Sequence, residues 1–118
     1  MRAPDPQVQL DATLAALADP ARRQVVDLLR RKPRRAGELA TELALSAARM
    51  SQHLRVLRAC GAIVEEGSGD DARVRRYRLR REPFAELRGW LDDVEGFWSA
   101  ELASFKAHAE RKRGGTRD

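Results

Sequence analysis

The sequence has few of the residues that build disulfides, metal centres and aromatic cores. Among 118 residues there is one cysteine, Cys60, which excludes an intramolecular disulfide and any site built on several thiolates of one chain. Aromatic residues make up only 5%, so the core has to be built from leucine, valine and alanine, a composition typical of packed helices. The sequence therefore predicts a mostly helical fold, in which Cys60 is an ordinary, partly buried thiol.

Long apolar segments are also missing. No run of eighteen or more apolar residues occurs, and residues 1–6 lack the continuous apolar stretch of a secretory signal, so we expect a cytoplasmic protein with no membrane partner. A chain of 118 residues has room for one hydrophobic core. We predict one domain over residues 9–109, a flexible N-terminus over 1–8 and a basic flexible tail over 110–118.

Positive charge is concentrated in one third of the chain. The formal net charge is +5, and nine arginines face four acids between residues 46 and 81, whereas the remaining residues carry equal numbers of basic and acidic groups. Such a local excess is typical of a surface that contacts a phosphate backbone. A basic surface that only aids solubility would give the same count.

The spacing of apolar residues predicts three helices in the first third of the chain. Leucines within residues 10–17 share one helical face. Asp19 and Pro20 then have the signature of an N-cap followed by a first-turn proline, so a second helix begins there. This helix ends at Lys32, because a residue that precedes proline avoids the α conformation. A third, short helix is predicted over 36–43.

A fourth helix begins after Ser46, which is a good N-cap, and ends before Gly61, which we expect to form a left-handed C-cap. Within this helix Met50, Leu54 and Leu57 lie in one narrow arc, and the opposite face is polar. The helix is therefore predicted to pack one side on the core and to present the other to a partner.

After the fourth helix the apolar period changes from that of a helix to that of a strand. Residues 63–66 and 73–79 are predicted to be strands joined by a glycine-rich, charged turn over 67–71, which makes a β-hairpin. From Pro83 the helical spacing returns and predicts a final helix of about six turns. The predicted fold class is mostly α with a small β-hairpin, a winged helix-turn-helix of four helices, two strands and a fifth helix.

A short helix, a tight turn and a polar-faced helix form a helix-turn-helix, whose second helix enters a major groove about 12 Å wide. The Gln52 amide can pair with adenine, and the guanidinium groups of Arg49 and Arg55 can pair with guanine or anchor phosphates. His53 lies nearer the core edge and suits packing or a phosphate contact better than metal binding. The predicted DNA-binding residues of this helix are Ser46, Ala48, Arg49, Ser51, Gln52, His53 and Arg55.

The hairpin carries three further candidate DNA contacts, Arg73, Arg75 and Arg76. These arginines can lie along the backbone or enter a narrow minor groove. Alternatively, they keep an exposed hairpin edge from pairing with other strands. Asp70 and Asp71 at the tip would repel phosphate and occupy some of the arginines.

Four short motifs together resemble the ArsR family of winged-helix repressors. They are LADPARR at 17–23, GELA at 37–40, SQHLRVL at 51–57 and CGAIV at 60–64, and the resemblance runs from about Leu10 to Phe105. It implies a homodimer in which the first and last helices pack across a two-fold axis. It also implies that the recognition helices enter successive major grooves of a roughly palindromic operator, and that a signal relieves repression.

The last helix supports a dimer independently of the resemblance. Its aromatic and aliphatic residues offer more apolar surface than one face of a small domain can bury, although part of that surface could belong to the intramolecular core. With the first helix included, the predicted dimerisation residues are Leu10, Leu14, Trp90, Val94, Phe97, Trp98 and Phe105.

The chain departs from the metal sensors of that family. The position of their cysteine motif corresponds to ELATEL at 38–43, which has no thiolate, and His108 has only Glu101 and Glu110 nearby where a second site would need more ligands. We therefore predict no metal and no cofactor, as in the family's metal-free branch, and the sequence names no inducer.

Two other functional classes remain for comparison. An enzyme is disfavoured, because the sequence has no Ser/His/acid arrangement, no glycine-rich phosphate loop and no carboxylate cluster in apolar surroundings. A winged-helix interaction module without specific DNA binding would carry acids or bulky apolar groups on the outer face of the fourth helix. We therefore expect a sequence-specific DNA-binding regulator that acts as a repressor.

Overall fold

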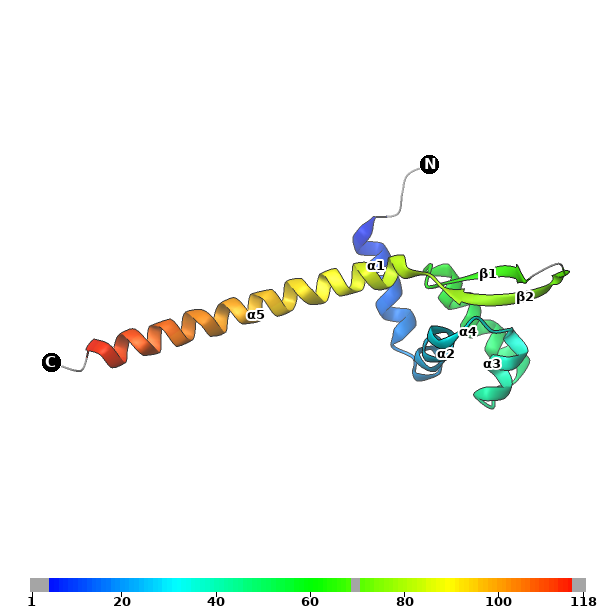
Figure 1. Cartoon of the computed structure of the whole chain (residues 1–118), viewed down its shortest axis with the longest axis horizontal. Coiled ribbons are helices and arrows are strands. Elements are labelled where there is room, and N and C mark those ends of the chain that lie inside the picture. The colour runs from blue at the N-terminus through cyan, green and yellow to red at the C-terminus, as the bar shows by residue number, and fades with distance from the viewer. Residues whose placement is uncertain (1–4, 69–70, 116–118) are drawn as a thin grey trace. The chain divides into compact units, whose positions relative to one another are not determined.

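The computed structural model describes residues 5–68 and 71–115, and only the backbone for residues 68, 71–73 and 113–115 among these. The described elements follow one another in the predicted order of four helices, a hairpin and a fifth helix (Figure 1), which confirms the winged helix-turn-helix class. They are α1 (Pro6–Leu17), α2 (Pro20–Arg31), α3 (Ala36–Glu42), α4 (Ala47–Ala59), β1 (Ile63–Ser68), β2 (Asp71–Leu79) and α5 (Arg81–Gly115).

The chain divides into two units within α5. The first ends at Leu87 and holds α1 to α4, the hairpin and the first turns of α5, and the second holds the rest of α5. With 35 residues, α5 is longer than the six turns that apolar spacing predicts, because its last turns are mostly polar and leave no periodic signal. The predicted domain limits at 9 and 109 fall inside helices, and the flexibility of the two ends stays a prediction.

Two side chains are helix N-caps, as the sequence predicts. The Asp19 carboxylate accepts hydrogen bonds from the backbone N–H groups of Ala21, at 2.8 Å, and Arg22, at 3.3 Å. The Ser46 hydroxyl accepts one from the N–H of Arg49 at 3.1 Å. These groups have no partner within their own helix, so each cap satisfies donors that would otherwise need water.

The core lies between α2, α3 and α4. Val25, Leu39, Met50 and Leu57 are almost completely buried, one or two from each of these helices. Cys60 is buried beside them, so the predicted thiol is more enclosed than expected. This packing fixes the inner side of α4 and leaves its polar side outward.

Helix α1 packs through small residues instead of its leucines. Thr13 and Ala16 are buried, and the Thr13 hydroxyl is satisfied because it donates to the carbonyl of Gln9 at 3.0 Å. Leu10 is half-buried and Leu14 is exposed. Two predicted dimerisation residues are therefore still accessible on α1.

The hairpin pairs antiparallel with Ile63 opposite Leu79 and Glu65 opposite Tyr77. Its second strand also pairs with Arg34, which precedes α3: the Arg34 N–H donates to Tyr77 O at 3.1 Å and the Tyr77 N–H to Arg34 O at 2.8 Å. This contact, which the sequence does not reveal, ties the hairpin to the start of the helix-turn-helix.

Candidate nucleic-acid interface

The turn between α3 and α4 sets the direction of α4, the predicted recognition helix. Ala44 adopts a left-handed conformation with φ of 54°, and the N–H of Leu45 donates to the carbonyl of Ala40 at 2.9 Å. A left-handed residue reverses the chain in a short distance, although it is strained for any residue other than glycine. The two helices therefore meet across a turn of four residues, 43–46.

The outer face of α4 brings six of the seven predicted DNA-binding residues of this helix together. Arg49, Gln52 and Arg55 are exposed and present two guanidinium forks and one amide on the side opposite the core. The Ser46 hydroxyl caps the helix but keeps its own hydrogen as a donor. The six exposed residues are Ser46, Ala48, Arg49, Ser51, Gln52 and Arg55.

His53 is the seventh residue and is half-buried. Its Nδ1 lies 3.4 Å from Nη1 of Arg22, which reaches it from α2. The sequence places His53 at the core edge but gives no sign of this partner, because the two residues are far apart in the chain.

Asp19 is the third member of a cluster formed with Arg22 and His53. Partial desolvation raises the pKa of Asp19, but the hydrogen bonds from the N–H groups of Ala21 and Arg22 and the positive charge of Arg22 outweigh it, with a smaller contribution from His53. The net pKa therefore lies below the ordinary value of 3.8. Asp19 stays ionised at neutral pH and faces Arg22 across 3.8 Å.

The hairpin provides fewer uncommitted arginines than the sequence count indicates. Arg75 is exposed, whereas Arg76 is half-buried. The side chain of Arg73 and the acids at the tip lie outside the residues whose side chains are described. Nearby, the acids of β1 neutralise two arginines of the basic stretch: Arg78 pairs with Glu66 at 2.9 Å, and Arg58 pairs with Glu65 at 3.3 Å. Arg75 is therefore the clearest phosphate contact to test.

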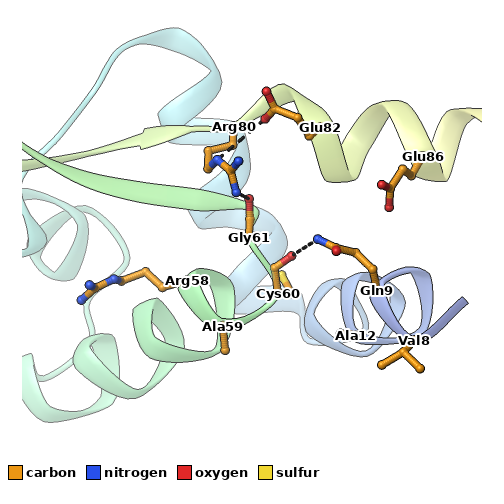
Figure 2. Close-up of a pocket in the computed structure, with 10 residues that line it drawn as sticks. All are labelled: Val8, Gln9, Ala12, Arg58, Ala59, Cys60, Gly61, Arg80, Glu82 and Glu86. Atoms are coloured by element: carbon orange, nitrogen blue, oxygen red, sulfur yellow. Dashed lines mark hydrogen bonds and ion pairs between the residues drawn. The ribbon is translucent and has the colours of Figure 1, made fainter. Parts of the chain in front are cut away.

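Two side chains hold the C-terminal end of α4 (Figure 2). The amide of Gln9, on α1, donates to the carbonyl of Cys60 at 3.4 Å, and the guanidinium of Arg80 donates to the carbonyl of Gly61 at 3.4 Å. Gly61 has the predicted left-handed conformation, with φ of 80°. These groups at the end of α4 border a cavity of about 570 Å³ between α1, the end of α4 and the start of α5.

In the second unit, α5 exposes an apolar stripe. Leu91, Trp98 and Phe105 recur every seven residues and are 47%, 60% and 75% exposed. Phe97 is also exposed and contacts Trp98 edge to face, with ring centroids 5.6 Å apart. The exposed apolar residues of this unit are Trp90, Leu91, Val94, Phe97, Trp98, Leu102 and Phe105.

Two other features, a metal site and a membrane span, are absent from the part of the chain that the structure describes. There, no three His, Cys, Asp or Glu residues are placed so that they could hold a metal ion. The same residues include no helix that is both long and apolar enough to cross a bilayer. The absence of a metal and of a cofactor stays a prediction.

Known proteins resemble this chain in the region of the helix-turn-helix. The family described as bacterial regulatory protein, arsR family, matches residues 19–65. The HTH-type transcriptional regulator Rv2034 of Mycobacterium tuberculosis H37Rv is 35% identical over 95 residues, which cover 80% of this chain and 83% of that protein. The HTH-type transcriptional repressor SmtB of M. tuberculosis CDC 1551 is 40% identical over 88 residues, which cover 72% of this chain and 63% of that protein.

Solved structures show the same architecture. An ArsR-like transcriptional regulator from Rhodococcus sp. RHA1 superposes with a TM-score of 0.71 at 29% identity, over 85% of this chain and 92% of that one. The homodimeric winged helix-turn-helix DNA-binding domain of Mb0332 from Mycobacterium bovis superposes with a TM-score of 0.59 at 26% identity, over 76% of this chain and 81% of that one.

Proposed function

This chain belongs to the ArsR family of winged helix-turn-helix transcriptional regulators, which are not enzymes, and from that premise we propose that it represses transcription by binding a palindromic operator as a homodimer. The observation that carries the proposal is the outer face of α4, where Arg49, Gln52 and Arg55 are exposed together opposite the buried arc. Helix α4 has no acidic residue, and its one exposed large apolar side chain is Val56, which is 39% exposed, so this face lacks the acids or the broad apolar surface that an interaction module would need.

These three side chains can read bases in the major groove. Arginine forks pair with guanine and a glutamine amide with adenine, and each good bidentate pair contributes about 1–3 kcal/mol of discrimination. Arg75, which is exposed on the hairpin, is the residue that we propose for a phosphate contact, and such contacts position the protein without reading sequence. Base reading and phosphate binding therefore lie on different elements.

Dimerisation is supported by the apolar stripe of α5 together with the exposed Leu14 on α1. Leu10, half-buried on the same helix, is included in the proposed interface. The M. bovis neighbour is named as a homodimer. A two-fold dimer places two recognition helices in major grooves about 34–36 Å apart, which requires a palindromic operator.

Repression is supported by the SmtB relative, which is named a transcriptional repressor, and would follow if the operator overlaps a promoter. Such a protein works where DNA is, so we place it in the cytoplasm. No inducer is assigned, because the described residues point to no ligand chemistry.

The test is a titration of the purified protein against a fluorescent duplex of its own upstream region and a scrambled duplex, at two salt concentrations. Gln52→Ala is expected to remove much of the preference for the upstream duplex. Arg75→Ala is its matched control: it is expected to weaken both duplexes alike and to reduce the slope of log affinity against log salt by about one phosphate contact.

The result can separate the alternatives. Wild-type protein is expected to prefer the upstream duplex by about 10³-fold or more. An operator whose two halves are moved apart by half a helical turn, about five base pairs, is expected to lose most of this preference, because the dimer can no longer reach both grooves. Equal, weak binding to all duplexes would instead favour the interaction module.

A further inference from the structure

The guanidinium of Arg22 lies where three helices meet. Arg22 belongs to the first turn of α2, and its side chain is only 17% exposed. Its Nε donates to the carbonyl of Ala16 at 2.6 Å and its Nη2 to that of Ala15 at 3.4 Å, both at the C-terminal end of α1. Its Nη1 lies 3.4 Å from Nδ1 of His53 on α4 and 3.8 Å from the Asp19 carboxylate.

This geometry determines which nitrogen of His53 carries the proton. Arginine has five N–H donors and no acceptor, whereas a neutral histidine has one donor and one acceptor. The nitrogen that faces Arg22 must therefore accept, so Nδ1 carries the lone pair and Nε2 carries the hydrogen. For a neutral His53, this contact favours the tautomer with the hydrogen on Nε2.

We propose that Arg22 is a positioning residue of the DNA-binding surface, which holds His53 as the Nε2-protonated tautomer so that its N–H can donate to the DNA backbone. His53 directly follows Gln52 and is half-buried on the flank of α4, so it is partly accessible beside the outer face. The inference rests on the function proposed above and adds a residue of α2 to the machinery of the recognition helix.

An arginine suits this place because its donors are spread over a planar fork. Three nitrogens of one group reach three acceptors in two helices at the same time. A lysine ammonium is a compact point charge and cannot bridge the same acceptors. Asp19, whose carboxylate lies 3.8 Å from Nη1, balances the charge of the mostly buried guanidinium.

The first test is NMR of the imidazole nitrogens in the DNA-free full chain, at about pH 8, where an unperturbed histidine is neutral. The chain has two histidines, and the exposed His108 serves as the internal reference. Wild-type protein is expected to show a hydrogen-bonded Nδ1 acceptor and a protonated Nε2 at His53. In Arg22→Gln the His53 nitrogen shifts are expected to move towards those of His108.

Arg23→Gln is the matched control. The Arg23 guanidinium also caps the end of α1, donating to the carbonyl of Leu17 at 2.7 Å, but within the described residues it is not hydrogen-bonded to α4. Removing it is expected to leave the His53 shifts at their wild-type values. If Arg22→Gln does not fold, Arg22→Lys replaces it: the charge is kept, and the same displacement of the His53 shifts is expected.

The second test is operator binding by the same variants. Arg22→Gln is expected to weaken binding about three- to ten-fold, the range for one hydrogen bond, whereas Arg23→Gln stays near wild type. In a His53→Ala background Arg22→Gln is expected to cause no further loss, because Arg22 acts through His53.

Four results would overturn the inference. Wild-type His53 shifts in Arg22→Gln, or an equal displacement in Arg23→Gln, would refute the tautomer assignment whatever the DNA data show. Displaced shifts with unchanged operator binding would make Arg22 a packing residue only. A wild-type protein that does not distinguish operator from scrambled DNA would refute the proposed function, and the positioning role with it, while the NMR result on the free protein would stand.

Discussion

At the scale of single residues, the start of α2 depends on one carboxylate. Asp19 accepts two backbone N–H groups and faces the guanidinium of Arg22. Its pKa is lowered in the folded state, because these interactions favour the charged form more than partial desolvation disfavours it. Folding is therefore linked to the ionisation of this group.

We predict that Asp19→Ala lowers the melting temperature by several degrees at pH 7, because two donors lose their cap. For a lowered folded-state pKa, the stabilising contribution is complete above the unfolded value and is lost as the pH falls through the folded value. The difference between wild type and Asp19→Asn, which keeps an acceptor but not the charge, is therefore expected to shrink as the pH falls below about 4. Thermal unfolding between pH 3 and pH 7 measures this.

An unchanged difference over that range would contradict the assigned pKa direction. Asp11→Asn, on an exposed position of α1, is the control and is expected to have little effect at any pH.

At the scale of elements, two left-handed residues border the recognition helix. Ala44 precedes it with φ of 54°, and Gly61 follows it with φ of 80°. At Gly61 an added Cβ would also lie 3.2 Å from the Arg80 guanidinium and 3.4 Å from the Gln9 amide, the two groups that hold the end of α4. Glycine at position 61 therefore suits its left-handed backbone, whereas alanine at position 44 does not.

We predict that Gly61→Ala destabilises the protein by about 1–2 kcal/mol, the cost of a left-handed residue with a Cβ. Chemical denaturation measures the change. Ala44→Gly is the paired variant, and it is expected to be neutral or stabilising by up to about 1 kcal/mol, because relief of strain competes with added entropy of the unfolded chain. Equal losses in both variants would show that backbone conformation does not govern these turns.

Short-range chemistry explains which elements the sequence could predict. The caps at Asp19 and Ser46 and the left-handed Gly61 depend on neighbours within four residues, and the buried arc of α4 follows from helical period. The pairing of Arg34 with Tyr77 and the contact of Arg22 with His53 join distant segments and leave no local pattern.

At the scale of the whole molecule, the proposed assembly depends on the apolar stripe of α5. Large aromatic side chains at the centre of an interface contribute most of its binding energy, and Trp98 is 60% exposed in the single chain. The roles of the dimerisation and DNA-binding residues stay predictions, because a contact with a second molecule leaves no pattern within one chain.

We predict that Trp98→Asp weakens dimerisation at least about 30-fold, which corresponds to the 2 kcal/mol that defines a hot spot, because it removes an aromatic contact and buries a charge. Analytical ultracentrifugation over a range of concentrations measures the dissociation constant. Ala103→Asp, an exposed position five residues along the same helix and therefore on nearly the opposite side, is the control and is expected to remain dimeric. Equal behaviour of the two variants would exclude the stripe as the interface.

The burial of Cys60 gives the protein an internal reporter. It is the only thiol of the chain, it lies at the end of the recognition helix, and its sulfur donates to the carbonyl of Leu57 at 3.3 Å. Cys60 is only 5% exposed and borders the cavity at the end of α4, so we expect a thiol reagent to react faster when that end opens, and the rate of alkylation reports this opening. Alkylation rates with and without DNA can thus compare the opening of this helix end in the natural sequence, with no attached dye.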